Sequence, residues 1–209
     1  MTGNNDSRTW FAQATAGVLE AIELVPYDLW SQPGLGSWTV RELVAHTVRA
    51  WTTTSTYLSA ALPDEDAPVV STPQYFVRAL ATPGVHDGIA QRARDDVAEL
   101  GPDPLDAARA HAARTTRIVD ALPDDRRLLT PGGVMLLGDY LSTRAFELTV
   151  HGLDLCRAID LDPPTDLARA AQPALILATQ VAIERGLAEA TLEALTGRTA
   201  FAQGLNVLA

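Results

Sequence analysis

The sequence contains no lysine, a single cysteine and no long apolar run. Because all 16 basic residues are arginine, chemistry that needs a lysine amine is excluded, such as Schiff-base formation or phosphate binding by a P-loop lysine. Cys156 alone cannot form an internal disulfide or a cysteine-based zinc site. Spanning a bilayer takes a run of about eighteen apolar residues, and the N-terminus lacks the pattern of a secretion signal. We therefore expect a cytoplasmic protein with no membrane-spanning helix.

Positive charge is also scarce. The formal net charge is -10 and the isoelectric point is near 4.7. Binding to nucleic acid or to an anionic membrane needs a basic surface, so we expect neither partner. The sequence also lacks the G-x-S-x-G motif of serine hydrolases and the glycine fingerprint of dinucleotide-binding folds.

Helical periodicity, interrupted by proline and glycine, predicts an all-α protein with one domain over residues 1–209. No segment alternates in the manner of a strand, and the simplest architecture is an antiparallel helical bundle. A short helix is expected around 74–80, within a long irregular connection that precedes the third helix. The main helices are expected at about 7–25, 38–61, 88–122 with a break near "GPDP", 134–159 and 166–195.

The second expected helix has a defined start. Thr39 and Glu42 form a T-x-x-E capping box, in which each side chain hydrogen-bonds the other residue's backbone N–H. His46 lies beside Leu43 on the apolar face that follows, so we expect it to point into the bundle.

Glu147 and His151 lie four residues apart in the fourth expected helix, so both side chains leave the same face. A carboxylate and an imidazole at this spacing can bind one divalent ion, and His46 could supply a third ligand from another helix. Three protein ligands leave a coordination position open, which is typical of catalytic metal sites. A hydrogen-bonded polar cluster without metal is the alternative.

Asp154 and Arg144 flank this pair on the same helix. Asp154 could accept a hydrogen bond from the imidazole of His151, as the partners of metal-bound histidines usually do; a solvated surface position is the alternative. Arg144 could bind a substrate carboxylate, but a structural salt bridge is favoured. We expect solvent exposure for His86 and burial for Cys156, and a packing role for His111.

Two segments together resemble a known family. "GLGSWTVRELVAHTVRAW" and, about a hundred residues later, "RAFELTVHGLDLCRAI" are similar to the mycothiol-dependent maleylpyruvate isomerase N-terminal domain of the DinB-like superfamily. The closing "LEALTGRTAFAQGLNVL" is similar to the tail of short members. The resemblance implies a DinB-like four-helix bundle in up-down-down-up order, here with an additional C-terminal helix. It also implies one divalent metal, typically zinc, bound by His46, Glu147 and His151.

The resemblance further implies a metal-dependent isomerase or S-transferase with mycothiol as co-substrate and an electrophilic small molecule as substrate. The family's isomerase has a separate C-terminal domain, where this sequence has a helix, so we expect S-transfer rather than maleylpyruvate isomerisation. A non-catalytic metal-binding bundle and a metal-dependent hydrolase are the alternatives, and nickel or iron would also suit the ligands. Apolar helical faces exceed what four helices need, which is consistent with a homodimer.

Overall fold

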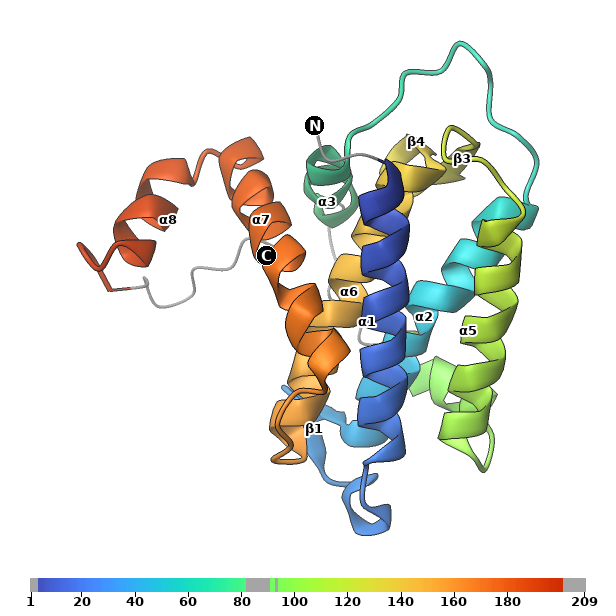
Figure 1. The fold of residues 1–209 in the computed structure, drawn as a ribbon, viewed down its shortest axis with the longest axis vertical. Coiled ribbons are helices and arrows are strands. Elements are labelled where there is room, and N and C mark those ends of the chain that lie inside the picture. The colour runs from blue at the N-terminus through green and yellow to red at the C-terminus, as the bar shows by residue number, and fades with distance from the viewer. Residues whose placement is uncertain (1–3, 82–90, 93, 201–209) are drawn as a thin grey trace.

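Four long helices form the body of the computed structural model, which describes residues 4–81, 91–92 and 94–200 (Figure 1). Their apolar faces meet in one core, in which Trp51, Tyr140 and Leu148 are fully buried. The all-α prediction is confirmed. The four helices are α1 (Asn4–Glu23), α2 (Val40–Ser59), α5 (Pro104–Asp120) and α6 (Leu137–Ala158).

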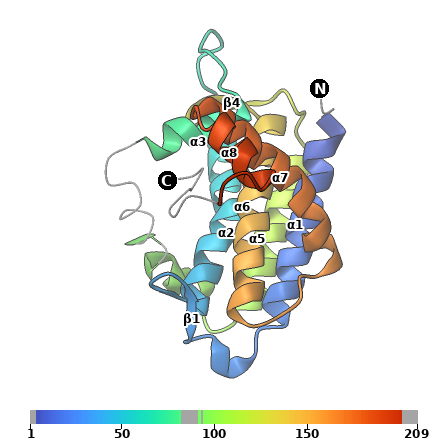
Figure 2. The same ribbon diagram turned by 90° about the vertical axis from the view of Figure 1, so that its left-hand side faces the viewer.

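The bundle has the expected up-down-down-up order. Figures 1 and 2 show α1 and α6 running in one direction and α2 and α5 in the other. Contacts between α2 and α5 agree: Arg41 at the start of α2 bonds to Gly101 just before α5, and Ser55 near the end of α2 bonds to Thr115. A parallel pair of helices needs a long connection, and the chain between α2 and α5 includes the short helices α3 (Thr72–Leu80) and η2 (Val97–Leu100).

Helix α2 begins as the capping box predicts. The Thr39 hydroxyl accepts a hydrogen bond from the Glu42 backbone N–H at 3.2 Å, and the Glu42 carboxylate accepts one from the Thr39 backbone N–H at 2.7 Å. The helix starts at Val40, two residues later than expected, because Trp38–Thr39 form a strand.

In the described residues of the connection between α2 and α5, the short helix and the helix break lie where the sequence predicts them. A second capping box, formed by Ser71 and Gln74, starts α3 at the expected short helix. The break expected near "GPDP" is present, since η2 ends at Leu100 and Gly101 adopts a positive φ of 59°. Asp103 then caps α5. The expected start of this helix at 88–90 lies outside the described residues.

Two small antiparallel hairpins accompany the helices, although no segment of the sequence alternates in the manner of a strand. β1 (Pro33–Leu35) pairs with β2 (Trp38–Thr39), and β3 (Arg127–Thr130) pairs with β4 (Gly133–Leu136). Each strand is too short for alternating hydrophobicity to show in the sequence. Because β4 uses residues that were expected to be helical, α6 starts at Leu137 rather than at Val134.

The expected C-terminal helix is divided in two. α7 (Thr165–Glu184) packs against α1 and α6, and α8 (Ala188–Leu195) follows after Gly186, whose positive φ of 71° ends α7. Leu175 is 57% exposed, since it lies on the outer face of α7. None of the described helices is long and apolar enough to cross a membrane.

Two glycines allow α1, α6 and α7 to approach each other closely. A Cβ atom at Gly17 would lie 2.5 Å from the backbone nitrogen of Leu167, and one at Gly152 would lie 2.8 Å from a methyl group of Val18. A larger residue at Gly17 would meet backbone and push α1 and α7 apart, whereas one at Gly152 would require the side chains of Val18 and Leu167 to shift. Gly152 directly follows His151, so this packing fixes the part of α6 that carries the candidate site.

Candidate metal centre

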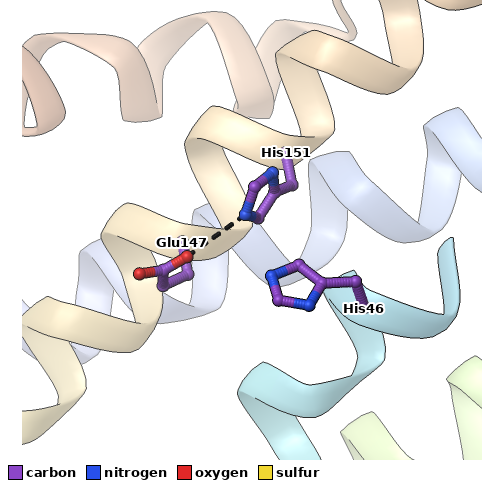
Figure 3. A group of neighbouring side chains, drawn as sticks. All are labelled: His46, Glu147 and His151. Atoms are coloured by element: carbon purple, nitrogen blue, oxygen red, sulfur yellow. Dashed lines mark ion pairs between the residues drawn. The ribbon is translucent and has the colours of Figure 1, made fainter. Parts of the chain in front are cut away.

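His46 from α2 and Glu147 and His151 from α6 point toward one another, as Figure 3 shows. One potential ligand atom from each residue lies within 4.8 Å of the other two. Glu147 Oε2 and His151 Nε2 are 3.2 Å apart, and the rings of His46 and His151 meet edge to face with centroids 4.8 Å apart. The two segments that the sequence placed over a hundred residues apart therefore meet at one point.

These distances are compatible with a single metal ion. Zinc bonds of about 2.0–2.2 Å in tetrahedral geometry separate ligand atoms by roughly 3.3 Å, close to the observed spacing of Glu147 and His151. His46 offers the third ligand atom, within 4.8 Å of the other two. Its Nδ1 is buried and has no hydrogen-bond partner among the described residues. Two imidazoles and one carboxylate form a donor set that suits zinc, and the residues therefore fit a divalent metal.

His151 lies between two carboxylates. Its Nε2 faces Glu147, and its Nδ1 lies 3.3 Å from Asp154 Oδ2. Burial alone would lower the pKa of His151, but the hydrogen bonds and negative charges of Asp154 and Glu147 outweigh it and raise the pKa to about 9. Asp154 thus occupies the position expected for the orienting partner, and Arg157 holds its other oxygen at 2.8 Å. A metal ion would replace the proton on Nε2.

The other two residues are already in the protonation state that a metal needs. Burial alone would raise the pKa of Glu147, but the hydrogen bond from His151 and the charges of His151 and Arg144 lower it to about 2. Burial and the nearby charge of His151 lower the pKa of His46 to about 3. At neutral pH Glu147 is therefore a carboxylate, and His46 is a neutral imidazole with a free lone pair.

The three residues open into a cavity of about 180 Å³ between α2, α3 and α6. Its walls include Tyr57, Tyr75 and Phe76, which offer aromatic surface, and Arg49 and Arg144, which offer positive charge. The cavity is large enough for a small organic molecule beside the candidate ligands.

A larger cavity of about 420 Å³ lies between the N-terminal ends of α1, α3 and α6 and the middle of α7. It is lined by Trp10, Ile176 and Leu177 together with hydroxyl and carboxylate groups. The cluster of candidate metal ligands found among the described residues lies at the smaller cavity, so we place the candidate site there.

Arg144 lies on α6 three residues before Glu147 and is only 8% exposed. The salt bridge expected for it is absent among the described residues. Its Nη2 donates to the Tyr75 hydroxyl at 3.0 Å, and its Nε donates to the Thr143 hydroxyl at 2.9 Å. Tyr75 was not identified from the sequence as a site residue. The one feature that could have pointed to it is its position in the short helix predicted within the long connection.

The remaining candidates lie apart from this cluster. Cys156 is buried, as expected. His111 is half-buried on α5 and lines a small separate cavity, which agrees with a packing role. His86 lies outside the described residues.

A family model for the mycothiol maleylpyruvate isomerase N-terminal domain matches residues 11–156. The chain belongs to this family. The matched range extends from α1 to near the end of α6 and includes His46, Glu147 and His151. A search of curated proteins and a search of solved structures found no match.

Membership in the mycothiol maleylpyruvate isomerase N-terminal domain family agrees with the observed bundle and its helix order. The match ends before α7 and α8, so these two helices are a feature that the family model does not describe. Both histidines and the glutamate of the candidate metal centre lie on the two helices that carry the family resemblance in the sequence.

Proposed function

We propose that this protein is a divalent-metal-dependent enzyme that activates a low-molecular-weight thiol for attack on an electrophilic small molecule. The observation that carries the proposal is the convergence of His46, Glu147 and His151 beside a cavity. The family description, which names mycothiol, supports a thiol co-substrate. Zinc is the metal that best suits the donor set, and nickel or iron would also bind.

The metal would supply one kind of chemistry: a cation lowers the pKa of a bound thiol and so provides thiolate at neutral pH. The residues of the chain prepare this site. His46 and Glu147 offer unprotonated ligand atoms, and Asp154 orients the ring of His151 through Nδ1. Tyr57, Tyr75 and Phe76 place aromatic surface along the cavity in which the electrophile would lie.

Metal content tests the first half of the proposal. We expect the protein, purified in the presence of zinc and dialysed, to retain about one equivalent of metal by elemental analysis. His46→Ala and His151→Ala should lose it, whereas His111→Ala, which removes a histidine from α5 that is not part of the cluster, should retain it. Absence of bound metal in the wild-type protein would overturn the proposal.

Thiol dependence tests the second half. With mycothiol and a chromogenic aryl chloride as the electrophile, we expect the zinc-loaded protein to accelerate conjugation and His46→Ala to abolish this acceleration. Turnover of an activated ester without thiol would instead identify a hydrolase that uses the same site. Bound metal without either activity would favour a non-catalytic metal-binding bundle.

A further inference from the structure

Arg144 is buried and makes no ion pair among the described residues, although the charge of Glu147 acts on it from farther away. Ion pairs among the described residues involve Arg8, Arg49, Arg94, Arg109, Arg157 and Arg169, but not Arg144. Its hydrogen-bond partners, Thr143 and Tyr75, are neutral. A buried cation is costly unless it is paired, so an arginine in this state is well suited to an anionic ligand.

Aromatic packing holds the guanidinium in place but does not neutralise it. The central carbon of Arg144 lies 5.4 Å from the ring centre of Tyr75 and 5.0 Å from that of Tyr140. These cation–π contacts fix the plane of the group. The second terminal nitrogen, Nη1, has no hydrogen-bond partner among the described residues, and Arg144 lines the cavity beside the candidate metal ligands.

Tyr75 adds an oriented hydrogen-bond donor. Because its hydroxyl oxygen accepts from Arg144, its own hydrogen is free to donate, and no acceptor for it is present among the described residues. The side chain is 7% exposed and lines the same cavity. Burial raises the pKa of Tyr75, so the phenol keeps its proton at neutral pH.

Arg49 provides the contrast. It lines the same cavity, but its Nη1 bonds to Asp96 at 2.6 Å, so its charge is already compensated. Glu147 is the acid nearest to Arg144 on α6, but it is directed at His151. Once Glu147 binds a divalent ion, the formal charges in the cavity leave an excess of positive charge even after a thiolate enters.

We infer that Arg144 and Tyr75 form an anion-binding pair that holds the carboxylate or carbonyl oxygen of the ligand next to the candidate metal centre. Applied to catalysis, this inference rests on the proposed function: the two residues bind the carboxylate or carbonyl oxygen of the electrophile and so position it beside the candidate metal centre.

A matched pair of inert probes tests the anion site without any turnover. Benzoate and benzamide have the same shape and differ in charge. We expect the wild-type protein to bind benzoate at least about tenfold more tightly than benzamide in calorimetric titrations, because charge-assisted hydrogen bonds have this strength. Arg144→Gln should remove the preference, and Arg49→Gln, the matched control, should retain it. Equal binding of the two probes, or a preference unchanged in Arg144→Gln, overturns the inference.

Tyr75→Phe keeps the ring packing and removes only the hydroxyl, so it decides the matter if Arg144→Gln does not fold. We expect this variant to bind benzoate roughly fivefold more weakly; unchanged affinity counts against the pair. Titration of metal-free His46→Ala separates this inference from the proposed function. If His46→Ala prefers benzoate and the wild-type protein binds no zinc, the anion site is supported and the metal proposal is overturned. If the wild-type protein binds zinc but shows no benzoate preference, the metal proposal is supported and the anion site is overturned.

Discussion

Metal binding should release about one proton from this protein at pH 7.5, and that proton should come from His151. The pKa of His151 is raised to about 9, so the metal-free imidazole is almost fully protonated at this pH. Glu147 and His46, with pKa values lowered to about 2 and about 3, have no proton to lose. An unperturbed histidine, with a pKa near 6.5, would release only roughly a tenth of a proton under the same conditions.

The same shift sets the pH dependence of affinity. Each pH unit below about 9 should weaken metal binding about tenfold, or ~1.4 kcal/mol, because the metal must displace one proton. Between pH 9 and pH 7 the loss is about fiftyfold, because half of the imidazole is already protonated at pH 9. Just below pH 6.5 the slope stays near one proton, because the pKa values of His46 and Glu147 lie much lower, at about 3 and about 2.

Calorimetry in buffers of different ionisation enthalpy measures the proton count directly. Asp154→Asn is the informative comparison, because it removes a carboxylate that raises the pKa of His151. A proton released by solvent would appear in both proteins, so the difference between them isolates the histidine. Release of no proton by the wild-type protein, or the same count in both, would refute the reasoning.

Three further predictions concern stability. Metal-free protein should be most stable near pH 6.5 in urea titrations, and a flat profile would contradict this. The raised pKa of His151 contributes stabilisation that is complete below its unfolded pKa of 6.5 and disappears as pH rises through about 9. The lowered pKa of His46 contributes stabilisation that is complete above 6.5 and disappears as pH falls toward 3. Gly17→Ala should cost about 1–3 kcal/mol of unfolding free energy, because the new methyl group meets the backbone of Leu167, and an unchanged urea midpoint would argue against the close approach. Thr39→Ala should cost about 1 kcal/mol through loss of the helix cap, seen as a lower melting temperature, whereas an unaltered one would show that the cap contributes nothing.

Local sequence signals predicted the elements that local interactions determine. The box of Thr39 and Glu42 fixed the start of α2 to within two residues, and Glu147 and His151 share a face because helical geometry alone requires it. The apolar face of α2 made His46 a candidate third ligand, and the family resemblance supported its meeting with α6, since no local pattern states which helices become neighbours.

Features that depend on tertiary contacts were missed. The bond between Tyr75 and Arg144 joins residues 69 positions apart, and no pattern in either segment indicates the other. The favoured salt bridge of Arg144 followed from surface statistics, which do not apply to a side chain that is 8% exposed. The division of α7 from α8 was missed because helical periodicity continues across Gly186.

The glycine at position 152 also bears on the stereochemistry of the proposed reaction. Because Val18 and Leu167 fill the space beside Gly152, α6 is closed on that side directly behind His151. A molecule can therefore approach His151 from the cavity between α2, α3 and α6. A planar alkene entering from one direction presents one of its two faces to the thiol, so we expect addition to a prochiral substrate to give a product of one handedness.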